Sequence, residues 1–334
     1  MCDVITAGEL LIDFTPASYP GAPVLFSPNP GGAPANVAVQ LAKLGIQVGF
    51  IGKVGNDSFG TLLTECLRSN GVNTEGVVKD NDYNTTLSFV ELNSNGDRSF
   101  TFYRKHGADT RLRTDEVDLR MIYGCRLFHF GSVSLTDQPS RETTSELVKT
   151  AFKCGKLISY DPNRRPALWA SESESLDIMR QGLPYCHILK VSEDELLFLS
   201  GTSSISEGIA YMVKQGIKII LVTLGADGCV FSANGFTGSL PAFAVNAVDT
   251  TASGDCFFGA FISRLIENGF HTPESLSSLT HRQLMEFCKF ASAAGAVCAS
   301  EYGGIPSVPD LKSIRECIDK TPLRTYGKDI KRTF

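Results

Sequence analysis

Short apolar runs alternate with helix-period segments along most of the chain. Runs bounded by polar turn residues predict strands, and apolar residues recurring every three or four positions predict helices. Strands are predicted at 3–14, 48–54, 127–130, 157–160, 188–190, 219–223, 229–231 and 243–245. Helices are predicted at 31–45, 59–68, 140–154 and 285–298, and through 257–262. This alternation is typical of an α/β protein with a mostly parallel sheet flanked by helices.

Two stretches interrupt the alternation. Between Pro16 and Pro30 five prolines and a glycine are expected to break regular structure. Farther along, the β-rich runs 85–92 and 99–103 flank Asn95-Gly96, and Asn-Gly is the strongest short hairpin signal. We interpret both stretches, roughly 10–30 and 84–106, as a small β lid inserted in a single domain spanning 1–334. The alternative is an extra antiparallel edge on the main sheet.

Composition places the chain in an ordinary class. The 334 residues are 43% hydrophobic and 20% charged, with a net charge of −5. This charge argues against nucleic acid or an anionic membrane as the main partner. The N-terminus lacks the basic and apolar regions of a signal peptide, and no run approaches the roughly 18 apolar residues of a membrane span. Ten scattered cysteines without a Cys-x-x-Cys pair predict reduced thiols in a cytoplasm.

The stretch from Val248 to Asp255 carries the first candidate chemistry. It lies between the run 243–245 and an apolar helix, and its residues are small. Backbone N–H groups at a helix N-terminus attract an anion, and small side chains let a ligand approach them. Asp255 at the edge of such a cradle suits phosphoryl transfer to a hydroxyl, because the carboxylate can accept the proton. A capping role for Asp255 explains this stretch alone equally well.

Polar or glycine-containing turns follow other predicted strands and helices. Open α/β sheets bind ligands at the carboxyl ends of their strands, where Asp161-Pro162-Asn163-Arg164-Arg165 is expected to lie. Ser192 and Glu195 have capping-box spacing, which by itself favours a structural role. Neither a Walker phosphate loop nor a Gly-x-Gly-x-x-Gly motif after the first strand is present in the sequence.

Two ordered signatures carry a family resemblance. Gly31-Gly32-Ala33-Pro34-Ala35-Asn36, together with Asp249-Thr250-Thr251-Ala252-Ser253-Gly254-Asp255, resembles the ribokinase-like (PfkB) carbohydrate kinases over nearly the whole chain. Asp161-Pro162-Asn163-x-Arg165 and Lys190-Val191-Ser192-x-x-Glu195 look most like the fructokinase branch. The resemblance implies a three-layer αβα sandwich with a β lid, and transfer of the ATP γ-phosphoryl group to a sugar hydroxyl with Mg²⁺.

The resemblance also implies roles for individual residues. Asp255 would be the general base, and the amides of Ala252, Ser253 and Gly254 would form the anion hole. The sugar would be held by Asp13, Gly31, Gly32, Asn36, Arg104, Asp161 and Arg165, with Arg164 as the alternative to Arg165. The nucleotide would be bordered by Ser192, Glu195, Thr223, Leu224, Gly225, Ala226, Asp227, Gly228, Gly254 and Ser292, with Glu195 organising Mg²⁺ and its waters.

A monovalent cation, K⁺ in this family, would be held near Asp249, Thr251, Cys298, Glu301, Gly303 and Ser307. The chain departs from the usual Gly-Ala-Gly-Asp turn at Ala252, whose Cβ would be strained if the backbone needed a positive φ. Fructose is the expected sugar, with ribose, 2-keto-3-deoxygluconate or a nucleoside as alternatives. A non-catalytic sugar-binding regulator is a hypothesis of another class, and the β lid suggests a homodimer.

Overall fold

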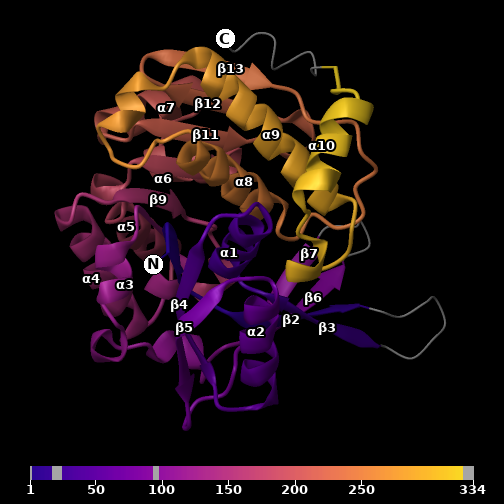
Figure 1. The fold of residues 1–334 in the computed structure, drawn as a ribbon. Coiled ribbons are helices and arrows are strands. Elements are labelled where there is room, and N and C mark those ends of the chain that lie inside the picture. Colours follow the sequence, from indigo (N-terminus) through magenta and orange to yellow (C-terminus); the bar gives the residue numbers. More distant parts are fainter. Residues whose placement is uncertain (1, 17–24, 93–97, 326–334) are drawn as a thin grey trace.

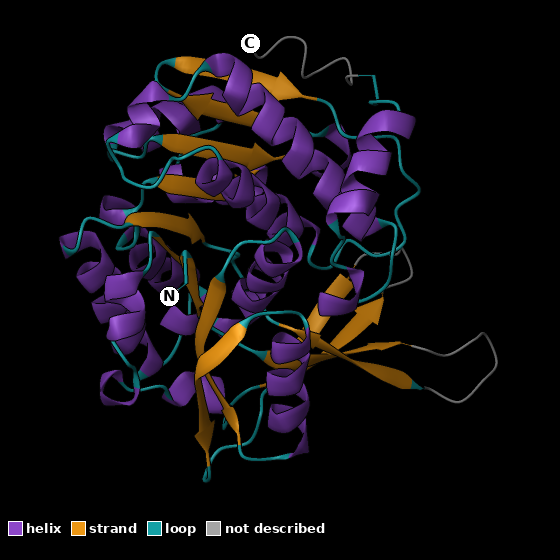
Figure 2. Cartoon of the chain, viewed as in Figure 1, coloured by secondary structure: helices purple, strands orange, loops and turns teal. Residues whose placement is uncertain are grey.

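Two separate sheets organise the chain in the computed structural model, which describes residues 2–16, 25–92 and 98–325 (Figures 1 and 2). The larger sheet has nine strands in the order β13-β12-β11-β10-β9-β8-β1-β4-β5. In that order they span Phe236–Leu240, Cys229–Ala233, Ile219–Thr223, Ile188–Ser192, Leu157–Asp161, Leu127–Gly131, Val4–Ala7, Val48–Gly55 and Asn73–Asp80. The run from β11 to β5 is parallel, whereas β12 and β13 join antiparallel. The predicted mostly parallel sheet is therefore confirmed.

Helices cover both faces of this sheet. One face carries α1 (Ala33–Lys43), α2 (Ser58–Ser69), α8 (Ser253–Glu267), α9 (His281–Ala299) and α10 (Leu311–Lys320) (Figure 1). The other face carries α3 (Arg120–Gly124), α4 (Ser140–Lys153), α5 (Glu172–Arg180), α6 (Glu193–Ser200) and α7 (Ile205–Lys214). This arrangement is the predicted three-layer αβα sandwich.

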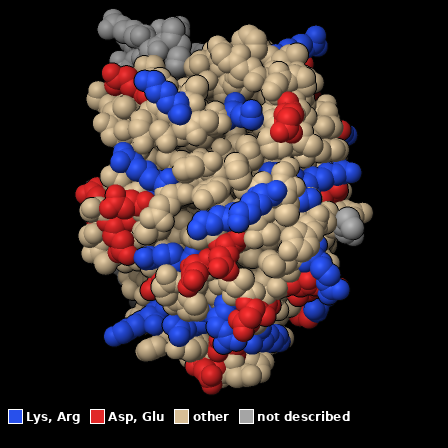
Figure 3. Space-filling view, turned by 90° about the vertical axis from the view of Figure 1, so that its left-hand side faces the viewer, with Lys and Arg blue, Asp and Glu red and all other residues tan. Residues whose placement is uncertain are grey.

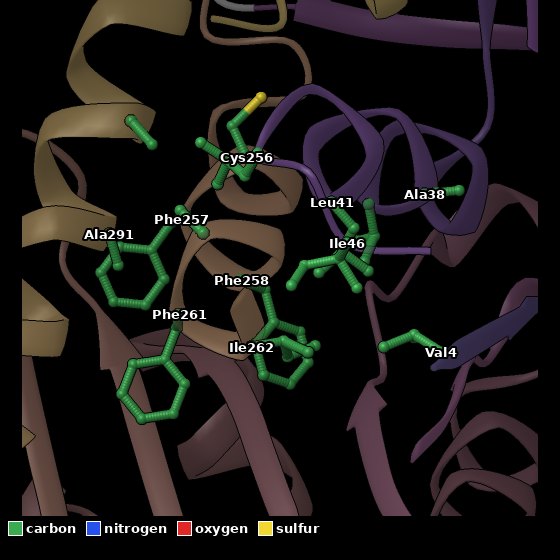
Figure 4. Close-up of a cluster of buried hydrophobic side chains, with 14 of the residues drawn as sticks. Val4, Ala38, Leu41, Ile46, Cys256, Phe257, Phe258, Phe261, Ile262 and Ala291 are labelled. Atoms are coloured by element: carbon green, nitrogen blue, oxygen red, sulfur yellow. The ribbon is translucent and has the colours of Figure 1, made fainter. Parts of the chain in front are cut away.

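Successive strand residues enter different cores because side chains alternate across a sheet. Val4 and Leu127 pack on the side of α1 and α8, whereas Ile5 and Phe128 pack on the side of α4. Burial on both faces explains why these strands read as continuous apolar runs. On the first side, the aromatic residues of α8 fill the space between α1 and α9 (Figure 4). This packing fixes the N-terminus of α8 against the sheet.

The smaller sheet has the order β3-β2-β6-β7. Its strands are β2 (Leu11–Pro16), β3 (Phe26–Gly31), β6 (Leu87–Leu92) and β7 (Arg98–Tyr103). β6 and β7 pair antiparallel as the hairpin signal predicts, although the turn at 93–97 lies outside the described residues. β2 pairs parallel with β6 and antiparallel with β3. The hairpin thus belongs to a sheet of its own, not to an edge of the main sheet.

Three predictions about strands are wrong. The single strand expected at 3–14 is two strands, because the chain turns at Gly8 (φ 151°) and passes from the main sheet into the small one. The proline-rich stretch contains β3, which tolerates Pro28 and Pro30 because it is an edge strand. The run at 243–245 forms only an isolated bridge from Phe243 to Leu323, where Phe243 fills the core without a continuous partner strand.

The described residues include no single helix long and apolar enough to cross a membrane. By length and composition alone, α6 and α7 would pass as a pair, and they are bent by 57°. On the face shown in Figure 3, basic and acidic side chains are interspersed. All ten cysteines are free thiols.

Candidate active site

Polar residues gather at the carboxyl edge of the main sheet, where the connections diverge. After β1 the chain passes into the small sheet and then α1 on one face, whereas the neighbouring β8 leads to α4 on the other face. Such a switch point is where open α/β sheets form a binding crevice. A cavity of about 580 Å³ lies here. Its wall includes Glu9, Asp13, Gly32, Asn36, Asn163, Arg164, Arg165, Lys190, Ser192, Glu195, Thr251, Ala252, Gly254 and Asp255.

Asp255 lies in the first turn of α8 with its carboxylate buried in this wall. Its Oδ2 accepts a hydrogen bond from Asn36 Nδ2 at 2.8 Å, and its Oδ1 accepts one from Asn163 Nδ2 at 3.4 Å. Burial raises the pKa of Asp255, while Lys190, the Asn36 hydrogen bond and Arg165 hold that rise back. Two predicted site residues, 219 positions apart in sequence, are thus in direct contact.

The turn before α8 is the segment in which an anion hole is predicted. Ala252 adopts a left-handed conformation (φ 64°, ψ −2°), so the positive φ considered for this position is present. The Ser253 N–H donates to the Thr250 carbonyl at 3.2 Å and is therefore engaged within the turn. A Cβ on Gly254 would lie 2.7 Å from Lys190 Nζ. Glycine at this position lets a buried ammonium group approach the helix N-terminus.

Lys190 is a site residue to which the motifs assigned no role. It forms an ion pair with Asp161 (2.9 Å), and both side chains are buried. Burial by itself lowers the pKa of Lys190, but the carboxylates of Asp161, Glu195 and Asp255 raise it overall, so the ammonium stays charged. A charged residue in the apolar run 188–191 was the available signal, because a buried charge needs partners. Asp161, expected at the sugar, is instead the ion-pair partner of Lys190.

The small sheet contributes Asp13 to the cavity. Asp13 accepts a hydrogen bond from the Ser88 hydroxyl, and burial raises its pKa to about 6. Gly31 lies against the Asp13 carboxylate, and Gly32 (φ 114°) lies against the Glu9 carbonyl, so a Cβ at either glycine would clash. Glu9 accepts a hydrogen bond from Ala33 N at 3.0 Å, and burial raises its pKa to about 7.

The three candidate arginines have different surroundings. Arg165 lines the cavity, and its charge offsets part of the rise that burial causes in the pKa of Asp13 and of Asp255. The Arg164 guanidinium lies 3.7 Å above the Phe198 ring, which favours Arg165 as the arginine that faces a ligand. Arg104 lies outside the wall of this cavity. Its guanidinium is bound by Asp109, Thr136, Asp137 and the Val133 carbonyl, beside a second cavity of about 410 Å³.

Glu195 links two turns at the carboxyl edge. The predicted capping box is present: Ser192 Oγ accepts from Glu195 N, and Glu195 Oε2 accepts from Ser192 N at 2.8 Å. Glu195 Oε1 accepts from Arg164 N at 2.6 Å. Each carboxylate oxygen keeps a further lone pair at the cavity wall, so the hard oxygen ligands that Mg²⁺ prefers are available.

The remaining predicted nucleotide residues lie at the end of β11. Thr223 ends that strand, and a 3-10 turn (Gly225–Asp227) with Gly228 at φ 107° leads into β12. Ser292 on α9 approaches Cys229 Sγ at 3.7 Å. Among the described residues that line the 580 Å³ cavity, none comes from Thr223–Gly228 or from Ser292. These residues therefore mark a neighbouring position along the same edge.

The predicted cation residues form a second cluster behind the turn. Asp249 accepts from Thr251 N at 2.7 Å and from Gly303 N at 3.1 Å. Cys298 Sγ lies 3.4 Å from the Thr251 carbonyl and 3.2 Å from Ser307 Oγ. Glu301 is exposed just after α9. Five of the six predicted residues thus lie together around the loop 249–251, which precedes α8.

Comparison with known proteins decides the family. Residues 1–311 match the model of the pfkB family carbohydrate kinases. The chain belongs to this family. Fructokinase-1 of Zea mays is 41% identical over 322 residues, covering 95% of this chain and 98% of that protein. Fructokinase-1 of rice is 42% identical over 311 residues, covering 92% and 94%.

Two solved fructokinase structures share the fold of this chain. The fructokinase of Xylella fastidiosa with bound ATP has a TM-score of 0.88 at 31% identity, covering 96% of this chain and 99% of that one. The fructokinase of Vibrio cholerae in its fructose-, ADP- and calcium-bound form has a TM-score of 0.84 at 29% identity, covering 95% and 99%. This pfkB family member is therefore an ATP-dependent carbohydrate kinase.

Proposed function

We propose that this kinase is a fructokinase, which converts fructose and ATP into fructose 6-phosphate and ADP. The observation that carries the proposal is the Asp255 carboxylate, buried at the N-terminus of α8 in one cavity wall with Asp13, Asn36 and Arg165. Relatives more than 40% identical over most of the chain carry the fructokinase name, which supports fructose over ribose, 2-keto-3-deoxygluconate or a nucleoside.

Asp255 acts as the general base in this proposal. The C6 hydroxyl oxygen of fructose bonds to the γ-phosphorus, the bond from that phosphorus to the bridging oxygen of ADP breaks, and Asp255 takes the hydroxyl proton. Asn36 holds one carboxylate oxygen at 2.8 Å, which fixes the orientation of the base. Asp13 and Arg165 offer an acceptor and donors for sugar hydroxyls.

Charge developing on the phosphoryl group is stabilised by the N-terminus of α8 and by Lys190. Ala252 and Gly254 line the cavity, and the Lys190 ammonium lies against Gly254, whereas the Ser253 N–H is engaged within the turn and not available as the predicted anion-hole donor. Fixed positive groups of this kind act without reorganisation during the reaction. When bound, Mg²⁺ supplies charge neutralisation on the ATP phosphates, and Glu195 would hold it or its waters. Thr223–Gly228 and Ser292 would border the nucleotide, and the Asp249 cluster would take K⁺.

Steady-state ADP formation tests the proposal. We expect turnover with fructose to exceed that with ribose, 2-keto-3-deoxygluconate and adenosine. Asp255→Asn should lower kcat by about 10²- to 10⁴-fold while leaving ATP affinity within a few fold. Preference for another acceptor would overturn the fructose assignment. Sugar binding without any phosphorylation would favour the non-catalytic regulator, and near-wild-type kcat in Asp255→Asn would remove the base assignment.

We also propose that the small sheet is the lid of one kinase domain and the interface of a homodimer. Phe14 and Phe89 stack with centroids 4.9 Å apart, and Phe26 and Tyr103 border the same cluster with exposed side chains. An exposed aromatic sheet face suits a second copy of the chain. Sedimentation should show a dimer that Tyr103→Asp weakens, and a wild-type monomer at all concentrations would contradict this.

The ten free thiols support a cytoplasmic location, which cell fractionation tests.

A further inference from the structure

Asn163 combines an unusual backbone with a central position in the cavity wall. It follows β9 by two residues and has φ 48°. Among the described residues, only Asn163, Asn234 and Ala252 have a positive φ without being glycine. Asn234 lies in the turn between β12 and β13, beside Gly235, and it does not line the cavity. Asparagine, aspartate and glycine all tolerate this backbone, so the turn alone does not require the Asn163 amide.

Both ends of the Asn163 side chain have partners in the site. Its Nδ2 donates to Asp255 Oδ1 at 3.4 Å, and its Oδ1 accepts from Arg165 Nη1 at 2.5 Å. Arg165 Nη1 also reaches the Asn163 carbonyl at 3.3 Å. One amide therefore connects the carboxylate proposed as the base with the arginine proposed to hold the sugar. Asn36 holds the other oxygen of Asp255 from α1.

We propose that Asn163 is a positioning residue for phosphoryl transfer: its amide fixes Oδ1 of Asp255 and the Arg165 guanidinium in one relative geometry. The inference rests on the proposed function, because it assigns Asn163 a role through the base. A misplacement of about 1 Å can cost roughly 100-fold in rate, so a single bridge between base and sugar contact has a measurable effect.

The charged groups around Asp255 determine how a change at Asn163 is felt. Lys190 from β10, Glu195 from α6, Arg165 from the turn and Asp13 from the small sheet all face this region. Asn163→Asp would place a second carboxylate beside Asp255 Oδ1 without changing the side-chain shape. Because a neighbouring like charge disfavours ionisation, the acidic limb of the kcat–pH profile should move to higher pH. Asn163→Gly removes the amide while keeping the left-handed backbone.

The experiment compares Asn163→Gly and Asn163→Asp with the matched control Asn234→Gly, using fructose and ATP. We expect Asn163→Gly to lower kcat by about 10- to 100-fold and to raise the KM for fructose several-fold. We expect Asn163→Asp to shift the acidic limb upward by at least half a pH unit. Asn234→Gly should leave kcat and KM within about twofold. Thermal unfolding of each variant establishes that it is folded.

Asp255→Asn separates the failure of this inference from that of the proposed function. If Asp255→Asn is inactive while both Asn163 variants retain wild-type kcat, KM and pH profile, the amide is only a turn residue and the inference fails alone. If Asp255→Asn keeps wild-type turnover, the base assignment fails and the positioning role fails with it. If Asp255 is the base, adding Asn163→Gly to Asp255→Asn should lower the residual kcat by a smaller factor than Asn163→Gly lowers the wild-type kcat, because the two residues are in contact and their effects are not additive.

Discussion

Replacing Ala252 with glycine would test whether the turn before α8 is strained. Ala252 is held at φ 64° with its Cβ buried, and this backbone costs an L-residue about 1–2 kcal/mol. Glycine removes that strain. It also adds about 0.5–1 kcal/mol of chain entropy to the unfolded state and loses up to about 0.8 kcal/mol of methyl burial. These opposing contributions nearly cancel, so Ala252→Gly should change the free energy of unfolding by less than about 0.5 kcal/mol.

A matched control isolates the strain. Ala260 is fully buried inside the same helix, so Ala260→Gly loses a methyl group and helix propensity without relieving any strain. That variant should be destabilised by about 2 kcal/mol. Urea unfolding of the two variants and the wild type measures the difference, provided that the slope with denaturant is unchanged. Equal destabilisation by Ala252→Gly and Ala260→Gly would refute the idea that the left-handed turn stores strain.

Two further predictions concern buried charges. Because Glu9 has a pKa of about 7, above its ordinary value of 4.5, the stability it confers is complete below pH 4.5 and is lost as pH rises through 7. Between pH 5 and pH 8 the wild type should therefore lose roughly 2.5 kcal/mol of unfolding free energy relative to Glu9→Gln, and parallel pH profiles would contradict this. Lys190→Met leaves Asp161 buried without its ion-pair partner, so the free energy of unfolding measured by urea titration should fall by about 3–5 kcal/mol. Adding Asp161→Asn to Lys190→Met should restore a large part of that loss. A loss below about 1 kcal/mol in Lys190→Met would show that Asp161 does not need the ammonium.

Much of the main sheet could be predicted from the sequence because its strands are buried on both faces. Each such strand is a short apolar run, and apolar residues recur every three or four positions in the helices, so the local pattern is enough to predict these elements. The errors occur where composition and position in the sheet disagree. Pro28 and Pro30 argue against a strand in general, but their missing N–H groups cost little on the edge strand β3. Edge position depends on tertiary pairing, which a local pattern does not contain.

The candidate site shows the same division. Asn36 and Asp255 meet, as the two signatures imply, because α1 and α8 present their N-terminal regions to one edge of the sheet. The partners that decide charge and orientation were not evident. Arg104 is bound by Asp109 and lies outside the wall of the 580 Å³ cavity, and Asp161 is bound by Lys190. Such contacts depend on side-chain directions that spacing along the chain does not determine.

The parallel pairing of β2 with β6 has a consequence for the order in which the molecule assembles. Ile12 pairs with Leu87, and Asp13 bonds to Ser88 across 75 positions, so the middle of the small sheet cannot form as a local hairpin. Closing so long a loop is entropically costly until α1, β4, α2 and β5 bring its ends together. The small sheet is therefore expected to order late and to open first. A sugar that contacts Asp13 would then stabilise the last part of the chain to fold, coupling substrate binding to the completion of folding.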